Sequence, residues 1–233
     1  AVAEEPYQKF LDELYRRRMF DVAMTYLDSL RDSRLVGEDV KVTIPFNEGL
    51  TLIEGAKYER DFPTRLDDLT TAQEKLKTFV EANPEHPLSS TANLRLGDVV
   101  LIRAQANLQL ADSASKTTAE KEELRKQARE QFKEAEEVFS TAEAKFQAEY
   151  DAFPNFIDSQ DTEQKEAKAQ TRENLILSML SVGRVIYEAA KAYAPNSGEY
   201  KAHLKRAAEE FEDAFKQWRR TPAGLYARMN QGR

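Results

Sequence analysis

Apolar residues recur every three to four positions along most of this chain, with polar residues between them. This spacing puts the apolar side chains on one face of an α-helix, so the pattern predicts an all-α fold. Prolines and short polar segments interrupt the stripes, because proline lacks the N–H group that a helix interior needs. The predicted helices cover residues 7–15, 20–30, 46–60, 64–83, 88–111, 119–150, 162–194 and 199–219, and a last one begins at Pro222.

The succession of these helices predicts a single helical-repeat region over residues 1–233. We expect an N-terminal helix hairpin over 6–33, an extended linker over 34–45, repeat-like helices over 46–111, long helices over 112–194 and a further repeat over 197–233. The second helix of that last repeat has barely begun where the chain ends. We therefore expect the chain to be a fragment of a longer protein.

The most regular apolar stripe lies in the middle of the chain. Its seven members are Leu124, Ala128, Phe132, Ala135, Phe139, Ala142 and Phe146. They span 22 residues in six steps, about 3.67 residues per step, which fits a nearly straight helix rather than a heptad coiled coil. The stripe and the helix that follows it predict two unusually long central helices.

A second pattern occurs twice, 135 residues apart. The first copy places Leu69, Ala72, Leu76, Val80, Pro87, Ala92 and Gly97, and the second places Leu204, Ala207, Phe211, Phe215, Pro222, Ala227 and Gly232 at the same offsets. Each copy predicts a helix, a proline break and a second helix, which is typical of stacked helix-pair repeats. Since small residues let two helices approach closely, we expect these positions to pack the repeats together.

On these residues the chain resembles the tetratricopeptide repeats. Ala72, Leu76 and Pro84 fall at the spacing that the family uses in its second helix, although Phe79 stands where a small residue is usual. In the second copy Ala207, Phe211 and Ala214 match the pattern, and Pro222 comes three residues late. The resemblance covers under half of the chain and implies antiparallel helix hairpins stacked as a tetratricopeptide-like α-solenoid.

The turn at 83–87, Asn-Pro-Glu-His-Pro, narrows the resemblance. Followed by Ala92 and Gly97, it is similar to the variant turn of bacterial envelope repeat proteins, among them the outer-membrane assembly lipoproteins and the Tol-Pal accessory proteins. The chain also resembles the N-terminal region of long bacterial tetratricopeptide proteins. These likenesses imply protein partners, and they imply a periplasmic or cell-envelope location.

Composition narrows the function. The net charge of −7 argues against a nucleic-acid-binding protein, which needs a basic face, and the longest apolar runs are too short to span a membrane. The absence of cysteine excludes disulfides and thiol chemistry, and fits a periplasmic chain or a cytoplasmic one. The start, Ala1-Val2-Ala3, is compatible with a mature end exposed by removal of a signal peptide.

The sequence offers no catalytic motif. His86 and His203 lie 117 residues apart and neither has a partner at metal-ligand spacing. Gly49 and Gly55 lack the lysine and hydroxyl of a phosphate-binding loop, and the acidic segment 158–163 lacks the spacing of a calcium loop. We therefore expect a protein that is not an enzyme and that holds neither a cofactor nor a metal.

One loop is a candidate contact surface. The segment Tyr150-Asp-Ala-Phe-Pro-Asn-Phe-Ile157 places Tyr150, Phe153, Phe156 and Ile157 between the two long helices. Aromatic side chains at such a site could anchor a partner protein. The alternative, which the apolar character of the loop favours, is that Phe153 and Phe156 fold back to cap the core.

These observations predict a protein–protein interaction or assembly scaffold without catalytic activity, in the bacterial cell envelope. Its partners would be other proteins, further repeats of the same chain or further copies of it. The first alternative is a self-assembling structural subunit of a large envelope complex. The second is a helical accessory domain of an enzyme that lies beyond residue 233.

Overall fold

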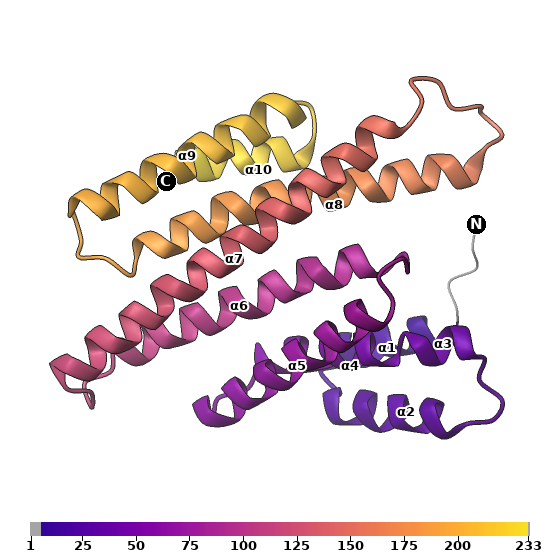
Figure 1. The fold of residues 1–233 in the computed structure, drawn as a ribbon, viewed down its shortest axis with the longest axis horizontal. Helices are drawn as coiled ribbons and strands as arrows, with labels where there is room; N and C mark the ends of the chain where they lie inside the picture. Colours follow the sequence, from indigo (N-terminus) through magenta and orange to yellow (C-terminus); the bar gives the residue numbers. More distant parts are fainter. Residues whose placement is uncertain (1–5, 233) are drawn as a thin grey trace. The chain divides into compact units, whose positions relative to one another are not determined.

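The computed structural model describes residues 6–232, and every regular secondary-structure element within them is an α-helix (Figure 1). The predicted all-α class is confirmed. The helices are α1 (Pro6–Arg16), α2 (Phe20–Asp32), α3 (Glu38–Val42), α4 (Ile44–Ala56), α5 (Phe62–Ala82), α6 (Ser89–Ala111), α7 (Thr118–Ala152), α8 (Thr162–Ala190), α9 (Gly198–Trp218) and α10 (Pro222–Gln231).

Helix ends follow local chemistry closely. Prolines occupy the first turns of α1, α4, α5 and α10, where the missing N–H has no helical partner to lose. Helix α7 begins with a capping box, in which Thr117 accepts from the Glu120 N–H and Glu120 accepts from the Thr117 N–H. The backbone and hydroxyl hydrogen bonds from Thr117 lower the pKa of Glu120 to about 2.

The prediction for residues 34–45 is wrong. Residues 34–45 were expected to form an extended linker, but α3 occupies Glu38–Val42 and α4 already begins at Ile44. The alternation of Val40, Val42 and Ile44 hid the helix, because five residues are too few for a 3.6-residue period to show. Tertiary contacts hold this segment, since Ile44 belongs to the same buried cluster as Leu11 and Leu27.

The chain divides into two compact units, residues 1–99 and 100–233, with the boundary inside α6. In the first unit, α1 and α4 run parallel. The hydroxyl of Tyr7 lies 3.2 Å from that of Thr43, and the hydroxyl of Tyr15 lies 2.9 Å from that of Thr51, each pair being 36 residues apart. Helices α4 and α5 are antiparallel, because the rings of Phe46 and Phe79 lie 5.6 Å apart and Gly49 packs against Leu76.

A buried carboxylate joins three helices of the first unit. Glu48 of α4 is only 2% exposed and pairs with Arg31 of α2 through Oε1. Its Oε2 lies 2.9 Å from Lys75 Nζ of α5, outside the angles of a hydrogen bond, so this second contact is an ion pair only. Glu48 thus links the two helices that flank α4.

The second unit repeats this alternation of direction. Helices α7 and α8 are antiparallel: Arg129 reaches the Ala192 carbonyl near one end of the pair, and Lys168 lies over the Tyr150 ring near the other. Helix α8 is also antiparallel to α9, because Gly183 packs on Phe211 while Trp218 Nε1 donates to Met179 Sδ.

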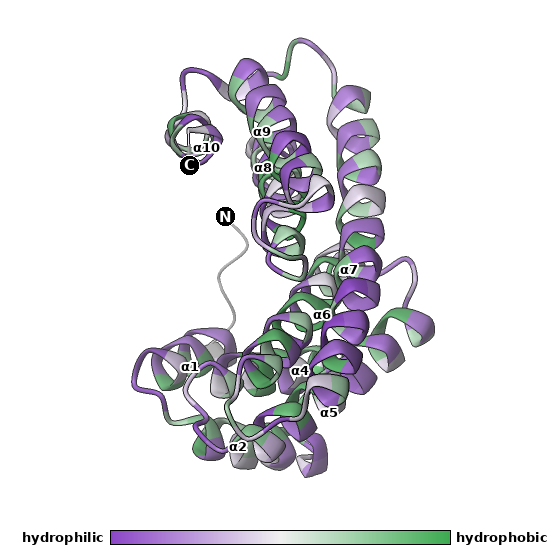
Figure 2. Ribbon diagram, turned by 90° about the vertical axis from the view of Figure 1, so that its left-hand side faces the viewer, coloured by the Kyte–Doolittle hydropathy of each residue, from purple (hydrophilic) through white to green (hydrophobic). Residues whose placement is uncertain are grey.

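It follows that α7 and α9 run parallel on either side of α8. Arg206 bridges to Glu136, and Gln217 Nε2 donates to Gln147 Oε1 over 3.0 Å, both across 70 residues. On α7, hydrophilic residues cover much of the helix (Figure 2). The members of its predicted stripe from Ala128 to Phe146 are all buried, whereas Leu124 is only half-buried.

The two copies of the repeated pattern agree in burial at some positions and differ at others. Three positions are buried in both copies, namely Ala72 and Ala207, Leu76 and Phe211, and Ala92 and Ala227. Both break prolines, Pro87 and Pro222, are exposed, and Leu69 is buried where Leu204 is half-buried.

The final glycine of the second copy is not a packing position. Gly97 is buried, but Gly232 is exposed and lies near only the carbonyls of Arg228 and Met229 in its own helix. Gly224 takes the close approach instead, because a Cβ there would collide with the backbone of Trp218 and Arg219.

Candidate functional site

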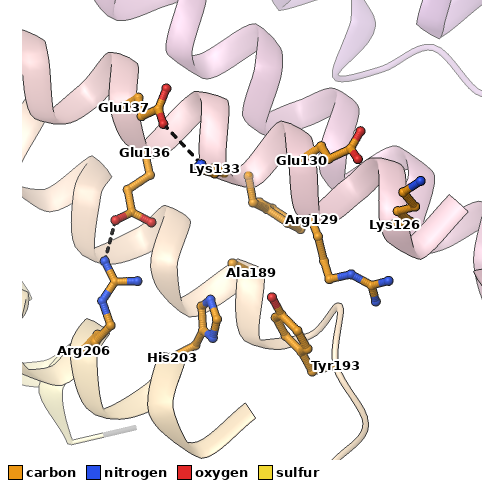
Figure 3. Close-up of a pocket in the computed structure, with 11 residues that line it drawn as sticks. Lys126, Arg129, Glu130, Lys133, Glu136, Glu137, Ala189, Tyr193, His203 and Arg206 are labelled. Atoms are coloured by element: carbon orange, nitrogen blue, oxygen red, sulfur yellow. Dashed lines mark hydrogen bonds and ion pairs between the residues drawn. The ribbon is translucent and has the colours of Figure 1, made fainter. Parts of the chain in front are cut away.

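A hollow of about 530 Å³ opens in the second unit between α7, the end of α8 and the start of α9 (Figure 3). We call it the α7–α9 pocket. Its floor is apolar and is formed by the Phe132 ring and Ala189. Its walls are Lys126, Arg129, Glu130, Lys133, Glu136, Glu137, Tyr193, His203 and Arg206.

Helical spacing explains why these side chains share one face. Lys126, Arg129, Lys133 and Glu136 follow one another at steps of three or four residues along α7, so they line one side of that helix. Figure 3 shows Tyr193, just beyond the end of α8, and His203 of α9 lying opposite them. The pocket therefore sits in the groove between two parallel helices, with α8 beneath it.

Arg129 organises one end of the pocket. Its guanidinium donates to the Ala192 carbonyl over 3.2 Å and to Glu122 Oε1 over 2.7 Å. The same group lies 5.5 Å from the centre of the Tyr193 ring, at a cation–π distance. Arg129 therefore contacts α7, the backbone just after α8 and the Tyr193 ring at once.

Tyr193 and His203 form an aromatic pair on the opposite wall. Their ring centres are 4.9 Å apart. His203 Nδ1 lies 2.9 Å from the Glu199 carbonyl, and because a carbonyl can only accept, Nδ1 carries the proton. In the neutral ring Nε2 is then an acceptor left for another group.

Ion pairs close the other end. Arg206 binds Glu136, and Lys133 Nζ lies 3.9 Å from Glu137 Oε1 (Figure 3). Four Lys and Arg side chains against three glutamates make the pocket slightly basic, in a chain whose net charge is −7. The pocket thus presents ammonium and guanidinium donors beside an aromatic wall, a combination suited to a polar segment of a partner.

Beyond the pocket the groove becomes acidic. Burial and the nearby carboxyl of Glu210 raise the pKa of Glu143 on α7. Burial, together with Asp213, raises the pKa of Glu210 on α9. Two carboxylates that resist ionisation therefore follow the ion pair between Glu136 and Arg206 along the same groove.

Among residues 6–232 no cluster of three or more His, Asp or Glu side chains could hold a metal ion. No helix in this range is both long and apolar enough to cross a lipid bilayer.

The structure separates the four residues predicted in the 150–157 loop. The Tyr150 ring packs edge-on against Trp218, with centres 5.9 Å apart, and Phe153 and Ile157 are half-buried. Phe156 is 83% exposed. Folding back against the core therefore describes part of this loop, and Phe156 alone projects into solvent.

The α7–α9 pocket was not predicted. His203 reads as an isolated histidine in the sequence, because its neighbours Tyr193 and Arg129 lie 10 and 74 residues away along the chain. The feature of the sequence that could have indicated the pocket is the helical spacing of three basic residues, Lys126, Arg129 and Lys133. His86, by contrast, serves its turn, where its Nδ1 accepts from the Leu88 N–H and its ring lies edge-on to Phe79.

Comparisons of the chain with protein-family models, with curated proteins and with solved structures each found no match.

Proposed function

We propose that this chain is a protein–protein interaction or assembly scaffold, built as a tetratricopeptide-like α-solenoid and without catalytic activity. Helices of alternating direction within each unit support the solenoid. So does the 36-residue spacing of the Tyr7–Thr43 and Tyr15–Thr51 contacts, because it is close to the 34-residue period of tetratricopeptide repeats.

The α7–α9 pocket is the observation that carries the binding function. Repeat proteins bind partners along the concave surfaces that their parallel helices line. Here the groove between α7 and α9 holds ordered aromatic rings and several charged groups, and its lining is already fixed by contacts such as Arg129 with the Ala192 carbonyl. A preorganised polar pocket favours binding, since fewer side chains lose freedom when a partner docks.

Site-specific photo-crosslinking tests the proposal. A benzoylphenylalanine at Lys126, on the pocket wall, is expected to capture one recurrent protein in cells, whereas the same group at Lys205 is not. Lys205 is an exposed residue of α9 that does not line the pocket. The double substitution Tyr193→Ala and His203→Ala should abolish the capture.

Equal capture at both positions, or capture that survives the double substitution, would refute this use of the pocket. The resemblance to envelope repeat proteins favours a periplasmic location, which fractionation of the same cells would test.

A second function, self-assembly into a structural complex, is favoured by the outer face of α10. Leu225 and Met229, one helical turn apart, are 66% and 53% exposed, and Tyr226 lies beside them. In the repeat register Met229 corresponds to Leu94, which is buried. Light scattering tests this function. The parent protein should form an oligomer of fixed size, and the variants Leu225→Glu and Met229→Glu should be monomers.

A further inference from the structure

The loop between α7 and α8 borders a second, smaller pocket. It measures about 200 Å³ and is lined by Tyr150, Ile157, Lys165, Lys168, Ala169 and Arg172. We call it the loop pocket. Its volume is below the roughly 300 Å³ at which small-molecule sites begin, so it fits one side chain of a partner better than a whole ligand.

All the charged residues that line the loop pocket are basic. Lys165, Lys168 and Arg172 follow one another along the first turns of α8, and no carboxylate joins them in the lining. The loop carboxylates have local roles: Asp158 Oδ1 accepts from the Gln160 N–H, and Asp161 Oδ1 caps α8 by accepting from the Gln164 N–H. The pocket is therefore a basic site on an acidic chain.

The two lysines also hold the loop in shape. Lys165 Nζ donates to the Ser159 carbonyl over 2.8 Å, and Lys168 Nζ donates to the Pro154 carbonyl over 3.2 Å. Lys168 lies over the rings of Tyr150 and Phe153 as well, at 5.5 and 5.9 Å. Each ammonium has three donors, so both retain capacity for a further acceptor.

Arg172 is the residue of the loop pocket whose donors are available to a partner. Its side chain is exposed, and no hydrogen bond or ion pair engages it within residues 6–232. A guanidinium presents paired N–H groups that match a carboxylate. Next to this basic wall, Ile157 contributes apolar surface and the neighbouring Phe156 stands 83% exposed.

We propose that the loop pocket docks an acidic peptide segment of a partner protein, with a carboxylate on Arg172 and the two lysines and an apolar neighbour against Phe156 and Ile157. The proposal rests on the protein-binding function proposed above. It adds a second binding site in the same unit and specifies that the partner segment bound there is acidic. Charge complementarity selects the acidic residue, and the exposed aromatic ring supplies an anchor.

The protein carries its own reporter for this site. Trp218 is its only tryptophan, and its ring lies edge-on to Tyr150, which lines the loop pocket. The probe is an acetylated hexapeptide, Glu-Asp-Leu-Glu-Phe-Asp-amide, titrated into the full chain at 50 mM salt. Tryptophan fluorescence and calorimetry are read together, and the control peptide, Gln-Asn-Leu-Gln-Phe-Asn-amide, keeps the apolar residues without the charges.

We expect saturable binding of the acidic peptide and at least tenfold weaker binding of the neutral one. The double variant Lys165→Gln and Arg172→Gln should lose tenfold or more, and Phe156→Ala should lose about threefold. The matched variant Lys205→Gln removes one exposed cation of α9 outside the pocket and should bind as the parent does. Circular dichroism of each variant confirms that it is folded.

Three outcomes would overturn the inference: equal binding of both peptides, unchanged binding by the double variant, or vesicles of phosphatidylserine binding more tightly than the peptide. Failure of the inference and failure of the proposed function are distinguishable. If the peptide does not bind but crosslinking at Lys126 still captures a partner, the acidic-segment proposal fails and the scaffold stands. If the peptide binds but crosslinking at Lys126 captures nothing, the function proposed for the α7–α9 pocket fails and the loop pocket remains as a binding site.

Discussion

The hydroxyl of Tyr15 in α1 lies 2.9 Å from the hydroxyl of Thr51 in α4. The contact joins two parallel helices of neighbouring hairpins, and eight residues earlier on each chain segment Tyr7 lies beside Thr43, the residue just before α4. Thr51 also donates to the Asn47 carbonyl over 2.8 Å, so its hydroxyl keeps a partner when the tyrosine hydroxyl is removed.

Tyr15→Phe should therefore lower the free energy of unfolding by about 1 kcal/mol at pH 7. Burial raises the pKa of Tyr15 to about 12, from an ordinary value of 10.0. The folded state thus holds the proton more tightly than the unfolded chain. The parent should lose up to about 2 kcal/mol of stability between pH 10 and pH 12, and Tyr15→Phe should lose less.

Urea unfolding across this pH range measures the difference. Tyr226→Phe, which alters an exposed tyrosine of α10, is the control and should keep the slope of the parent. If the unfolding free energies of Tyr15→Phe and the parent fall equally between pH 10 and pH 12, the raised pKa of Tyr15 is contradicted.

Gly183→Ala should destabilise the second unit. A Cβ at this position would come within 2.9 Å of the Phe211 ring, so α8 and α9 would have to move apart. Overpacking of this kind costs about 1–3 kcal/mol. At Gly55 the nearest atoms of Phe20 would be 3.6 Å away, and Gly55→Ala should instead stabilise by up to about 1 kcal/mol through helix propensity.

Thermal unfolding of both alanine variants measures these two changes in stability, which should have opposite signs. If Phe211→Leu restores the stability of Gly183→Ala, the clash with the ring is established as the cause. A Gly183→Ala protein as stable as the parent would show that the two helices are not held at this distance.

Glu143→Gln should stabilise the protein at neutral pH and leave it unchanged in acid. Burial and Glu210 raise the pKa of Glu143 above 4.5, so the fold favours the protonated carboxyl. The stability that this preference contributes is complete below pH 4.5 and is lost as the pH rises through the raised pKa. Glutamine cannot ionise, and because the site is partly exposed the gain at pH 7 should be about 0.5 kcal/mol.

Denaturant titrations at pH 3 and pH 7 test this dependence. Glu134→Gln, an exposed glutamate of the same helix, should be near neutral at both values. A gain for Glu143→Gln that is equally large at pH 3 would argue against ionisation as the cause.

Glu48→Gln should destabilise the first unit, because Arg31 and Lys75 lose their shared buried anion. Both cations remain 45% and 38% exposed and can hydrate, so the loss should stay near 1–2 kcal/mol. Glu13→Gln removes a carboxylate that pairs with Arg16 and Arg17 at the surface, and should destabilise the protein much less than Glu48→Gln does. Equal effects of the two substitutions, measured by urea unfolding, would exclude a special role for Glu48.

Local chemistry made most helices predictable. The end of α5 at Ala82, the start of α8 at Thr162 and the start of α10 at Pro222 all lie within a residue or two of their predicted places. Helix α7 begins at Thr118, one residue before its predicted start at 119, with Thr117 as its N-cap. The predicted ends at 60 and 194 lie beyond the observed ends of α4 at Ala56 and α8 at Ala190, and α3 was missed because it is too short to show a period.

The sequence by itself determined the helical class, most helix starts and the buried stripe of α7, because a 3.6-residue period and its caps act between residues a few positions apart. Tertiary structure alone decided which helices lie side by side. It brought Arg129 of α7 to Tyr193, and it brought Tyr193 to His203 of α9. These contacts depend on how three helices pack, and an apolar stripe marks the buried face of a helix without specifying its neighbour.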